Sequence, residues 1–121
     1  MVFKDPPPEP KIDLKTIFSP TLSLFDIDDI EIARQFTIME YDLFTKIKPY
    51  ELLNQSWTKP KLKHRAVNVL NLINRSTEIS SWVSSVIVRE PKLRNRIKIY
   101  TRFIKIAEVC CIAKFEFSLN L

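Results

Sequence analysis

The stretch FDIDDIEIARQFTIMEYDLF, residues 25–44, decides how this chain folds. At 3.6 residues per helical turn, its side chains divide between two faces. One face carries Ile32, Ala33, Phe36, Met39, Leu43 and, just beyond the stretch, Ile47, and the nearly opposite face carries Ile30, Arg34, Thr37, Ile38 and Tyr41. The first set predicts the core side of an amphipathic helix. The second face mixes apolar, aromatic and charged residues, which indicates that it meets either another layer of the domain or a partner protein.

Proline and apolar spacing predict the elements that follow. Pro49 ends the first helix and can start a short one over residues 49–54. Apolar residues at spacings of three and four predict a long helix over 66–88, or two helices with a weak point at 74–77. Its Ser-rich stretch STEISSW, residues 76–82, predicts close packing against a neighbouring helix, with hydroxyls bonded back to the backbone as the alternative.

After Pro91, a last helix is predicted from Lys92 to about Lys114. It carries two apolar stripes side by side. The first contains Leu93, Ile97, Tyr100, Ile104, Ala107 and Cys111, and the second contains Ile99, Phe103, Ile106 and Cys110. Such a broad apolar surface predicts more than one covering neighbour.

Composition predicts an all-α protein in a reducing compartment. The chain has 121 residues, 45% of them hydrophobic, and no glycine. Gly-rich phosphate loops are therefore excluded, and tight β-hairpins are disfavoured. The adjacent residues Cys110 and Cys111 diverge on a helix and should not bridge each other. No apolar run has the length of a membrane span, and the N-terminus lacks the apolar core of a secretory signal, so we expect a cytoplasmic protein.

Charge is distributed unevenly. Residues 44–114 hold 15 Lys or Arg against four acids, whereas residues 1–31 hold seven acids against three lysines. The basic loop TKPKLKHR, residues 58–65, and the set Arg94, Lys98, Arg102 and Lys105 on the last helix contribute many of the cations. An acidic protein, an anionic membrane surface or nucleic acid would suit this polarity, and a solvated surface without a partner is the plain alternative.

No set of residues predicts covalent chemistry. His64 is the only histidine, and no Cys, Asp or second His stands at metal-ligand spacing from it. Neither cysteine has an evident base partner. We therefore expect no catalytic residue, no metal site and no cofactor.

Three motifs carry a family resemblance. They are IARQFTIME at 32–40, KPYELLNQSW at 48–57 and RIKIYTRFIKIAE at 96–108. In order and spacing, this part of the chain resembles the first half of the catalytic domain of Ras-type guanine-nucleotide exchange factors, the RasGEF domain. The resemblance covers about residues 25–110.

The resemblance implies an all-α domain of orthogonal helices, with two long helices and the two-faced N-terminal helix. It also implies that the chain binds the switch region of a Ras-family small GTPase and promotes GDP release without covalent chemistry. Arg34 and Thr37 match the family's GTPase-contacting positions, and they lie on the second face with Ile30, Ile38 and Tyr41. Membrane contact would be indirect, through the lipidated GTPase.

Residues 1–12 hold four of the eight prolines and no apolar periodicity, which predicts a Pro-rich flexible leader over residues 1–13. For residues 14–121 the resemblance implies a partial RasGEF domain, whose C-terminal half, with the protruding helical hairpin that opens the nucleotide site, is absent. We expect such a fragment to lack exchange activity and to self-associate through exposed apolar faces. Two alternatives remain open: a basic helical nucleic-acid-binding module, and a GTPase-binding scaffold without exchange. The sequence does not single out one GTPase of the Ras family.

Overall fold

The computed structural model describes residue 9 and residues 11–119, and it contains helices and no strand within that range. The long helices are α2 (Asp29–Thr45), α3 (Val67–Arg89) and α4 (Leu93–Leu119). The short ones are α1 (Leu14–Ile17) and the 3₁₀ helices η1 (Leu24–Asp26), η2 (Pro49–Gln55) and η3 (Lys63–Arg65). The predicted all-α class is confirmed, whereas most of the predicted Pro-rich leader lies outside the described residues.

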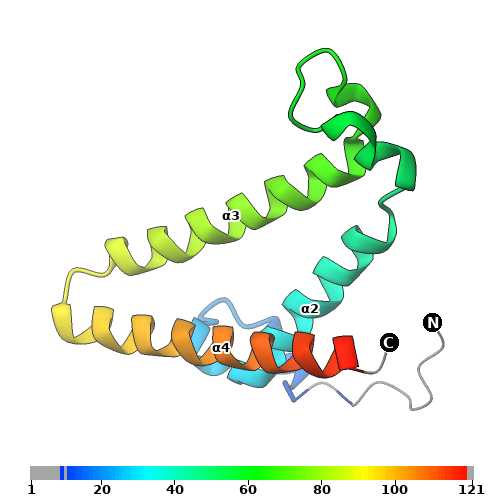
Figure 1. The fold of residues 1–121 in the computed structure, drawn as a ribbon. Helices are drawn as coiled ribbons and strands as arrows, with labels where there is room; N and C mark the ends of the chain where they lie inside the picture. The colour runs from blue at the N-terminus through cyan, green and yellow to red at the C-terminus, as the bar shows by residue number, and fades with distance from the viewer. Residues whose placement is uncertain (1–8, 10, 120–121) are drawn as a thin grey trace.

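The three long helices are arranged like the sides of an open triangle (Figure 1). The first part of α2 crosses α4, and this is the most extensive contact between elements. The far end of α2 leads into η2 and η3, which form a knob at the corner where α3 begins. Helix α3 then runs back to meet the start of α4.

Helix α2 begins at Asp29, within the range Asp26 to Asp29 where the aspartates predict its cap, and two local caps divide the stretch 25–44. Ser23 caps η1 by accepting a hydrogen bond from the Phe25 amide, at 3.4 Å. The backbone is extended at Ile27 and Asp28, and an Asp28 carboxylate oxygen accepts a bond from the Ile30 amide at 2.8 Å. An aspartate cap of this kind satisfies an amide that has no partner within the helix.

Helix α3 is continuous, so the predicted weak point at 74–77 does not break it. The Ser-rich stretch is exposed, and its hydroxyls bond to backbone carbonyls one turn earlier, as Ser80 does to Ser76 at 3.0 Å. The same pattern joins Ser84 to Ser80 at 3.0 Å. The favoured prediction of close packing is therefore wrong for these serines within the described residues, and the alternative of back-bonding holds.

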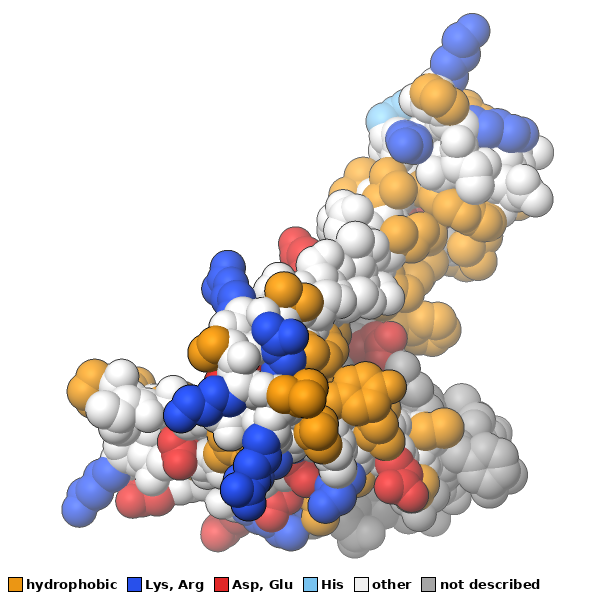
Figure 2. Space-filling model, turned by 90° about the vertical axis from the view of Figure 1, so that its left-hand side faces the viewer, with side chains coloured by type: hydrophobic (Ala, Val, Ile, Leu, Met, Phe, Trp, Pro, Cys, Tyr) orange, Lys and Arg blue, Asp and Glu red, His pale blue; other side chains and the backbone are white. Residues whose placement is uncertain are grey.

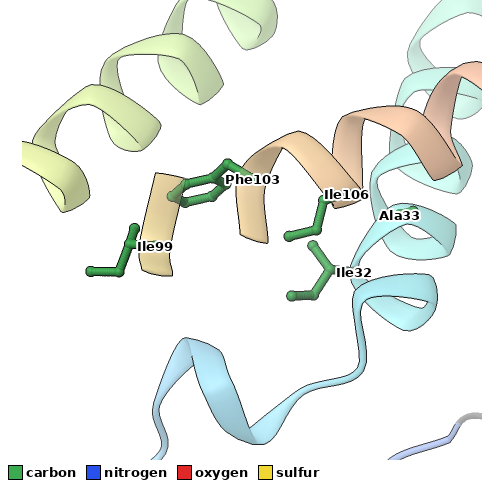
Figure 3. Close-up of a cluster of buried hydrophobic side chains, with 5 residues drawn as sticks. All are labelled: Ile32, Ala33, Ile99, Phe103 and Ile106. Atoms are coloured by element: carbon green, nitrogen blue, oxygen red, sulfur yellow. The ribbon is translucent and has the colours of Figure 1, made fainter. Parts of the chain in front are cut away.

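The buried core lies where α2 crosses α4. It consists of Ile32 and Ala33 from α2 with Ile99, Phe103 and Ile106 from α4 (Figure 3). The predicted core side of α2 is thus buried at its N-terminal end. It is not buried along its whole length, since Met39 is 41% exposed. The reason is the crossing: beyond its first part, α2 runs away from α4 (Figure 1).

The two apolar stripes of α4 have different surroundings. The stripe with Ile99, Phe103 and Ile106 forms the core, whereas Leu93, Ile97 and Tyr100 on the other stripe are exposed. The described elements therefore cover only one of the two stripes, and the uncovered stripe is a large apolar surface on an otherwise charged helix.

Trp82 of α3 joins the three long helices. Its ring meets Phe36 of α2 edge-to-face at 6.2 Å and Phe103 of α4 at 5.4 Å between centroids. These two aromatic contacts link α3 to both α2 and α4.

We expect Trp82→Ala to lower the free energy of unfolding by about 2 kcal/mol, because it removes both edge-to-face contacts from a side chain that remains partly solvated. Urea unfolding followed by circular dichroism measures this change. Tyr100→Ala, at an exposed aromatic position of α4, serves as the control. Equal effects of the two substitutions would show that the Trp82 contacts do not hold the helices together.

Candidate functional site

The second face of α2, defined by Ile30, Arg34, Thr37, Ile38 and Tyr41, is the candidate site. All five residues lie on one helix at spacings that keep them on one side. Ile38 is 57% exposed and Ile30 is 37% exposed, while the remaining three are half-buried. The structure therefore keeps the predicted residues together on a surface that is apolar and accessible at Ile38.

A buried carboxylate holds Arg34 in place. Glu31 is 4% exposed, and its Oε2 atom lies 3.5 Å from an Arg34 guanidinium nitrogen. The other carboxylate oxygen accepts a hydrogen bond from the Gln35 side chain at 2.9 Å, and Oε2 also accepts one from the Lys11 amide at 3.3 Å. Glu31 thus joins the second face of α2 to the N-terminal segment and limits the positions available to Arg34.

Thr37 lies beside the crossing with α4. The Thr37 hydroxyl donates a hydrogen bond to the Ala33 carbonyl oxygen at 2.8 Å. The Cys110 sulfur of α4 lies 4.0 Å from that same oxygen. Helix α4 therefore forms one border of the second face, and Thr37 is oriented by the backbone of its own helix.

Glu51 is a second buried carboxylate, which the sequence reasoning did not single out. It is 1% exposed although it lies in the short helix η2. Its oxygens accept bonds from the amides of Lys48 at 2.7 Å, Asn68 at 2.7 Å and Val69 at 3.3 Å, and from the Asn68 side chain at 3.1 Å. The position of Glu51 three residues after Lys48 is the spacing of a capping box, which is the signal that could have identified it.

Glu51 also caps a second helix. Helix α3 begins after Ala66, which has no side chain that can accept a bond from the first amides. Glu51 supplies that acceptor across the loop, and its negative charge lies at the positive end of the α3 dipole. One side chain therefore fixes both η2 and the start of α3.

Arg102 departs from the solvated basic set predicted on α4. Its guanidinium lies 2.9 Å from an Asp29 carboxylate oxygen, bonds to the Ile27 carbonyl and lies 5.4 Å above the centre of the Phe25 ring. Arg94, Lys98 and Lys105 are exposed. Arg102 therefore ties the segment before α2 to α4, and it does not extend the exposed cationic surface.

The hydrogen bonds to Glu31 and Glu51 lower the pKa of both carboxyl groups below 4.5. For Glu31, the Gln35 side chain has the largest effect and outweighs burial, which acts in the opposite direction. For Glu51, burial raises the pKa, and the combined bonds from Lys48, Asn68 and Val69 outweigh it. Each carboxylate thus favours the folded state while it is ionised.

We expect the melting temperature to be steady near neutral pH and to fall as the pH drops below about 4.5, the value at which an unfolded glutamate takes up its proton. A depressed pKa contributes stability above the unfolded value, and this contribution is lost as pH falls through the folded value. Circular dichroism melts across that range measure the effect. In a Glu31→Gln, Glu51→Gln double variant the fall should be shallower, and an unchanged slope would contradict the assignment.

On the core side of α2, an open groove of about 570 Å³ lies between the segment before α2 and α2 itself, and no residue of the second face lines it. Its lining is apolar for the most part and includes Ile12, Leu24, Ile32, Met39 and Trp82, with Glu31 and Gln35 at one side. The described residues hold no group of three metal-ligating side chains. None of the helices in the described range combines the length and the apolar character needed to span a membrane.

Comparison with known proteins gives consistent results. The RasGEF domain family matches residues 31–115. "Ras guanine nucleotide exchange factor J" of Dictyostelium discoideum is 55% identical over 108 residues, which are 89% of this chain and 13% of that protein. "Ras guanine nucleotide exchange factor A" of the same organism is 50% identical over 107 residues, which are 88% of this chain and 18% of that protein.

The matched range, residues 31–115, includes Arg34, Thr37, Ile38 and Tyr41 of the second face. Ile30 lies one position before the start of this range. The chain spans less than a fifth of the length of these relatives. The family resemblance of the three sequence motifs is thereby confirmed: the chain belongs to the RasGEF domain family.

Proposed function

We propose that this chain contacts a Ras-family small GTPase through the second face of α2 and contributes to GDP release. The observation that carries the proposal is an accessible Ile38, 57% exposed, beside an Arg34 already oriented by buried Glu31. An exposed apolar side chain next to an oriented guanidinium is typical of a protein interface, where apolar and Arg anchors dominate the binding energy. Family membership supports a Ras-family GTPase as the partner.

The mechanism we propose requires no covalent step. A protein that binds the nucleotide-free GTPase more tightly than the nucleotide-bound form must weaken nucleotide binding by the same factor. The second face would supply part of that differential binding, with Ile38 buried against the GTPase and Arg34 paired with an acceptor on it. Exchange of this kind shifts the GTPase population from the nucleotide-bound to the nucleotide-free form. It would take place where a lipidated GTPase is anchored, at the cytoplasmic side of a membrane.

We further propose that residues 14–121 form a docking part of a RasGEF domain and that exchange requires additional segments. None of the three motifs corresponds to the protruding helical hairpin that the family resemblance implies for opening the nucleotide site. The uncovered stripe of α4, with Leu93, Ile97 and Tyr100 exposed, fits this proposal because further helices would remove that apolar area from water. In isolation, the same stripe would favour self-association.

The test uses a chimera in which this chain forms part of an active exchange factor. Residues 14–121 replace the matching segment of the Dictyostelium exchange factor J, and release of fluorescent GDP is measured for a panel of Ras-family GTPases. We expect the chimera to accelerate release from at least one of them. A folded chimera that accelerates none, while the parent factor does, would contradict the proposed function.

The isolated chain tests the docking proposal separately. We expect it to bind the nucleotide-free GTPase in a pull-down and to leave the GDP release rate unchanged. Acceleration by the isolated chain would show that no additional segment is required. Failure to bind, with the chimera active, would show that the second face alone is not a docking surface.

A further inference from the structure

The knob formed by residues 49–65 has a fixed inner side and an unusual outer side. On the inner side, buried Glu51 ties η2 to the first turn of α3. Two successive residues, Asn54 and Gln55, have positive φ angles of 56° and 52°, and the Ser56 hydroxyl bonds to the Leu53 carbonyl oxygen at 2.6 Å. Left-handed residues other than glycine carry a conformational cost, so this turn is held in place by its surroundings.

The outer side of the knob carries only positive charge. Lys59, Lys61, Lys63 and Arg65 are exposed, and none of them forms an ion pair with any residue that the structure describes. The single acid in this segment is Glu51, whose oxygens face backbone amides and not the cations. The surface is therefore basic without local neutralisation.

Apolar side chains adjoin these cations. Tyr50 is 60% exposed, Leu52 is 53% exposed and Leu53 is 64% exposed. Figure 2 shows Lys and Arg side chains on the knob at the top of the molecule and hydrophobic side chains beside and below them. The left-handed turn follows Leu53 directly, so the strained backbone and the exposed leucines belong to the same feature.

We propose that this knob docks directly onto a bilayer that contains anionic phospholipids. The four cations would lie at the phosphate level, while Tyr50, Leu52 and Leu53 would enter the boundary between headgroups and acyl chains. A membrane surface offers negative charge immediately above apolar material, and the knob presents the complementary combination. This contact adds a direct membrane interaction to the indirect one expected through a lipidated GTPase, and it does not depend on the proposed GTPase binding.

A bilayer fits these observations better than nucleic acid does. Exposed leucines gain nothing from a phosphate backbone, and the knob has one exposed aromatic ring where a single-stranded binding site would use several. The basic set Arg94, Lys98, Arg102 and Lys105 lies on α4, away from the knob (Figure 1), and Arg102 among them is paired with Asp29. The cations of the knob and those of α4 therefore do not form one continuous track.

The test is co-sedimentation of the full 121-residue chain with vesicles of phosphatidylcholine containing about 30% phosphatidylserine, at about 0.1 M salt. We expect binding that disappears with pure phosphatidylcholine. Because each cation near such a surface contributes about a fivefold gain in partition, Lys59→Glu, Lys61→Glu, Lys63→Glu should lower binding by at least about a hundredfold. The corresponding triple Gln variant, which adds no negative charge, should bind less than the wild type and more than the triple Glu variant.

A matched control reverses three exposed charges at and just before the start of α4, with Lys92→Glu, Arg94→Glu and Lys98→Glu. It changes the net charge by the same amount and should retain most of the binding. Equal loss of vesicle binding in both triple variants would overturn the proposal, because binding would then depend on the net charge of the chain and not on the cations of the knob.

The apolar part has its own variant, Leu52→Ser, Leu53→Ser, which we expect to reduce vesicle binding by about tenfold with an unchanged circular dichroism spectrum. The control is Leu93→Ser, Ile97→Ser on the exposed stripe of α4, which should leave binding near the wild-type value. Absence of wild-type binding to the anionic vesicles would overturn the proposal. Capture on polyglutamate beads without vesicle binding would also overturn it, and would favour an acidic protein as the partner.

Discussion

A chain that carries Glu51→Ala is expected to melt about 15 °C below the wild type, the largest stability change of any single substitution considered. The reason is the number of donors that lose their acceptor at once. The amides of Lys48, Asn68 and Val69 all bond to this carboxylate, at 2.7, 2.7 and 3.3 Å. Ala66 cannot take over the capping of α3, because its side chain has no acceptor. A thermal melt followed by circular dichroism measures the change.

Two further variants separate this cap from ordinary surface effects. Glu51→Gln retains one acceptor oxygen but turns a second position into a donor, so it should melt between the alanine variant and the wild type. Glu78→Ala removes a glutamate whose side chain is 67% exposed and which pairs with Arg75, and it should leave the melting temperature nearly unchanged. If Glu51→Ala behaves like Glu78→Ala, the carboxylate does not connect η2 to α3.

The second large effect is expected in binding. Ile38→Glu should lower the affinity for the GTPase by at least about thirtyfold, because it places an unpaired carboxylate at the centre of the proposed interface. The melting temperature should stay close to the wild-type value, since Ile38 is 57% exposed in the chain. Titration of the chain into nucleotide-free GTPase by calorimetry measures the change.

Ile104→Glu is the matched control, because Ile104 is 52% exposed on α4 and lies outside the second face. It should bind the GTPase as the wild type does. Arg34 is a less suitable position for charge reversal, since a glutamate there would face buried Glu31. Arg34→Gln avoids that repulsion and should weaken binding while it leaves the fold intact.

The helices could be predicted because their ends are determined locally. Pro49 and Pro91 interrupt the helical pattern, and Asp28 caps α2 through its own side chain. These signals act over a few residues, so a sequence contains them in full. The separate 3₁₀ turn over residues 24–26, with a cap of its own at Ser23, was not predicted.

Burial could not be predicted in the same way, because it depends on how the helices cross. The α4 sequence offers two apolar stripes of similar quality, and only the crossing with α2 decides that Ile99, Phe103 and Ile106 become the core. The same crossing leaves Met39 exposed on a face whose pattern predicts a core. Which residues are buried therefore depends on tertiary geometry, which no local sequence pattern contains.

The second face of α2 was predictable in part. Helical spacing grouped Ile30, Arg34, Thr37, Ile38 and Tyr41, and the structure keeps them on one side of α2. Spacing could not indicate that Glu31 would be buried and would hold Arg34, because that depends on the N-terminal segment that covers it. The role of the face in GTPase binding stays a prediction.

Site-specific photocrosslinking is the measurement that tests this role most directly. A benzophenone side chain is introduced at position 38 or at position 104, and each chain is irradiated with nucleotide-free Ras-family GTPase. We expect a covalent adduct from position 38 that excess GDP with Mg²⁺ suppresses, and little or no adduct from position 104. An adduct from position 104 without one from position 38 would contradict the assignment of the GTPase to the second face of α2.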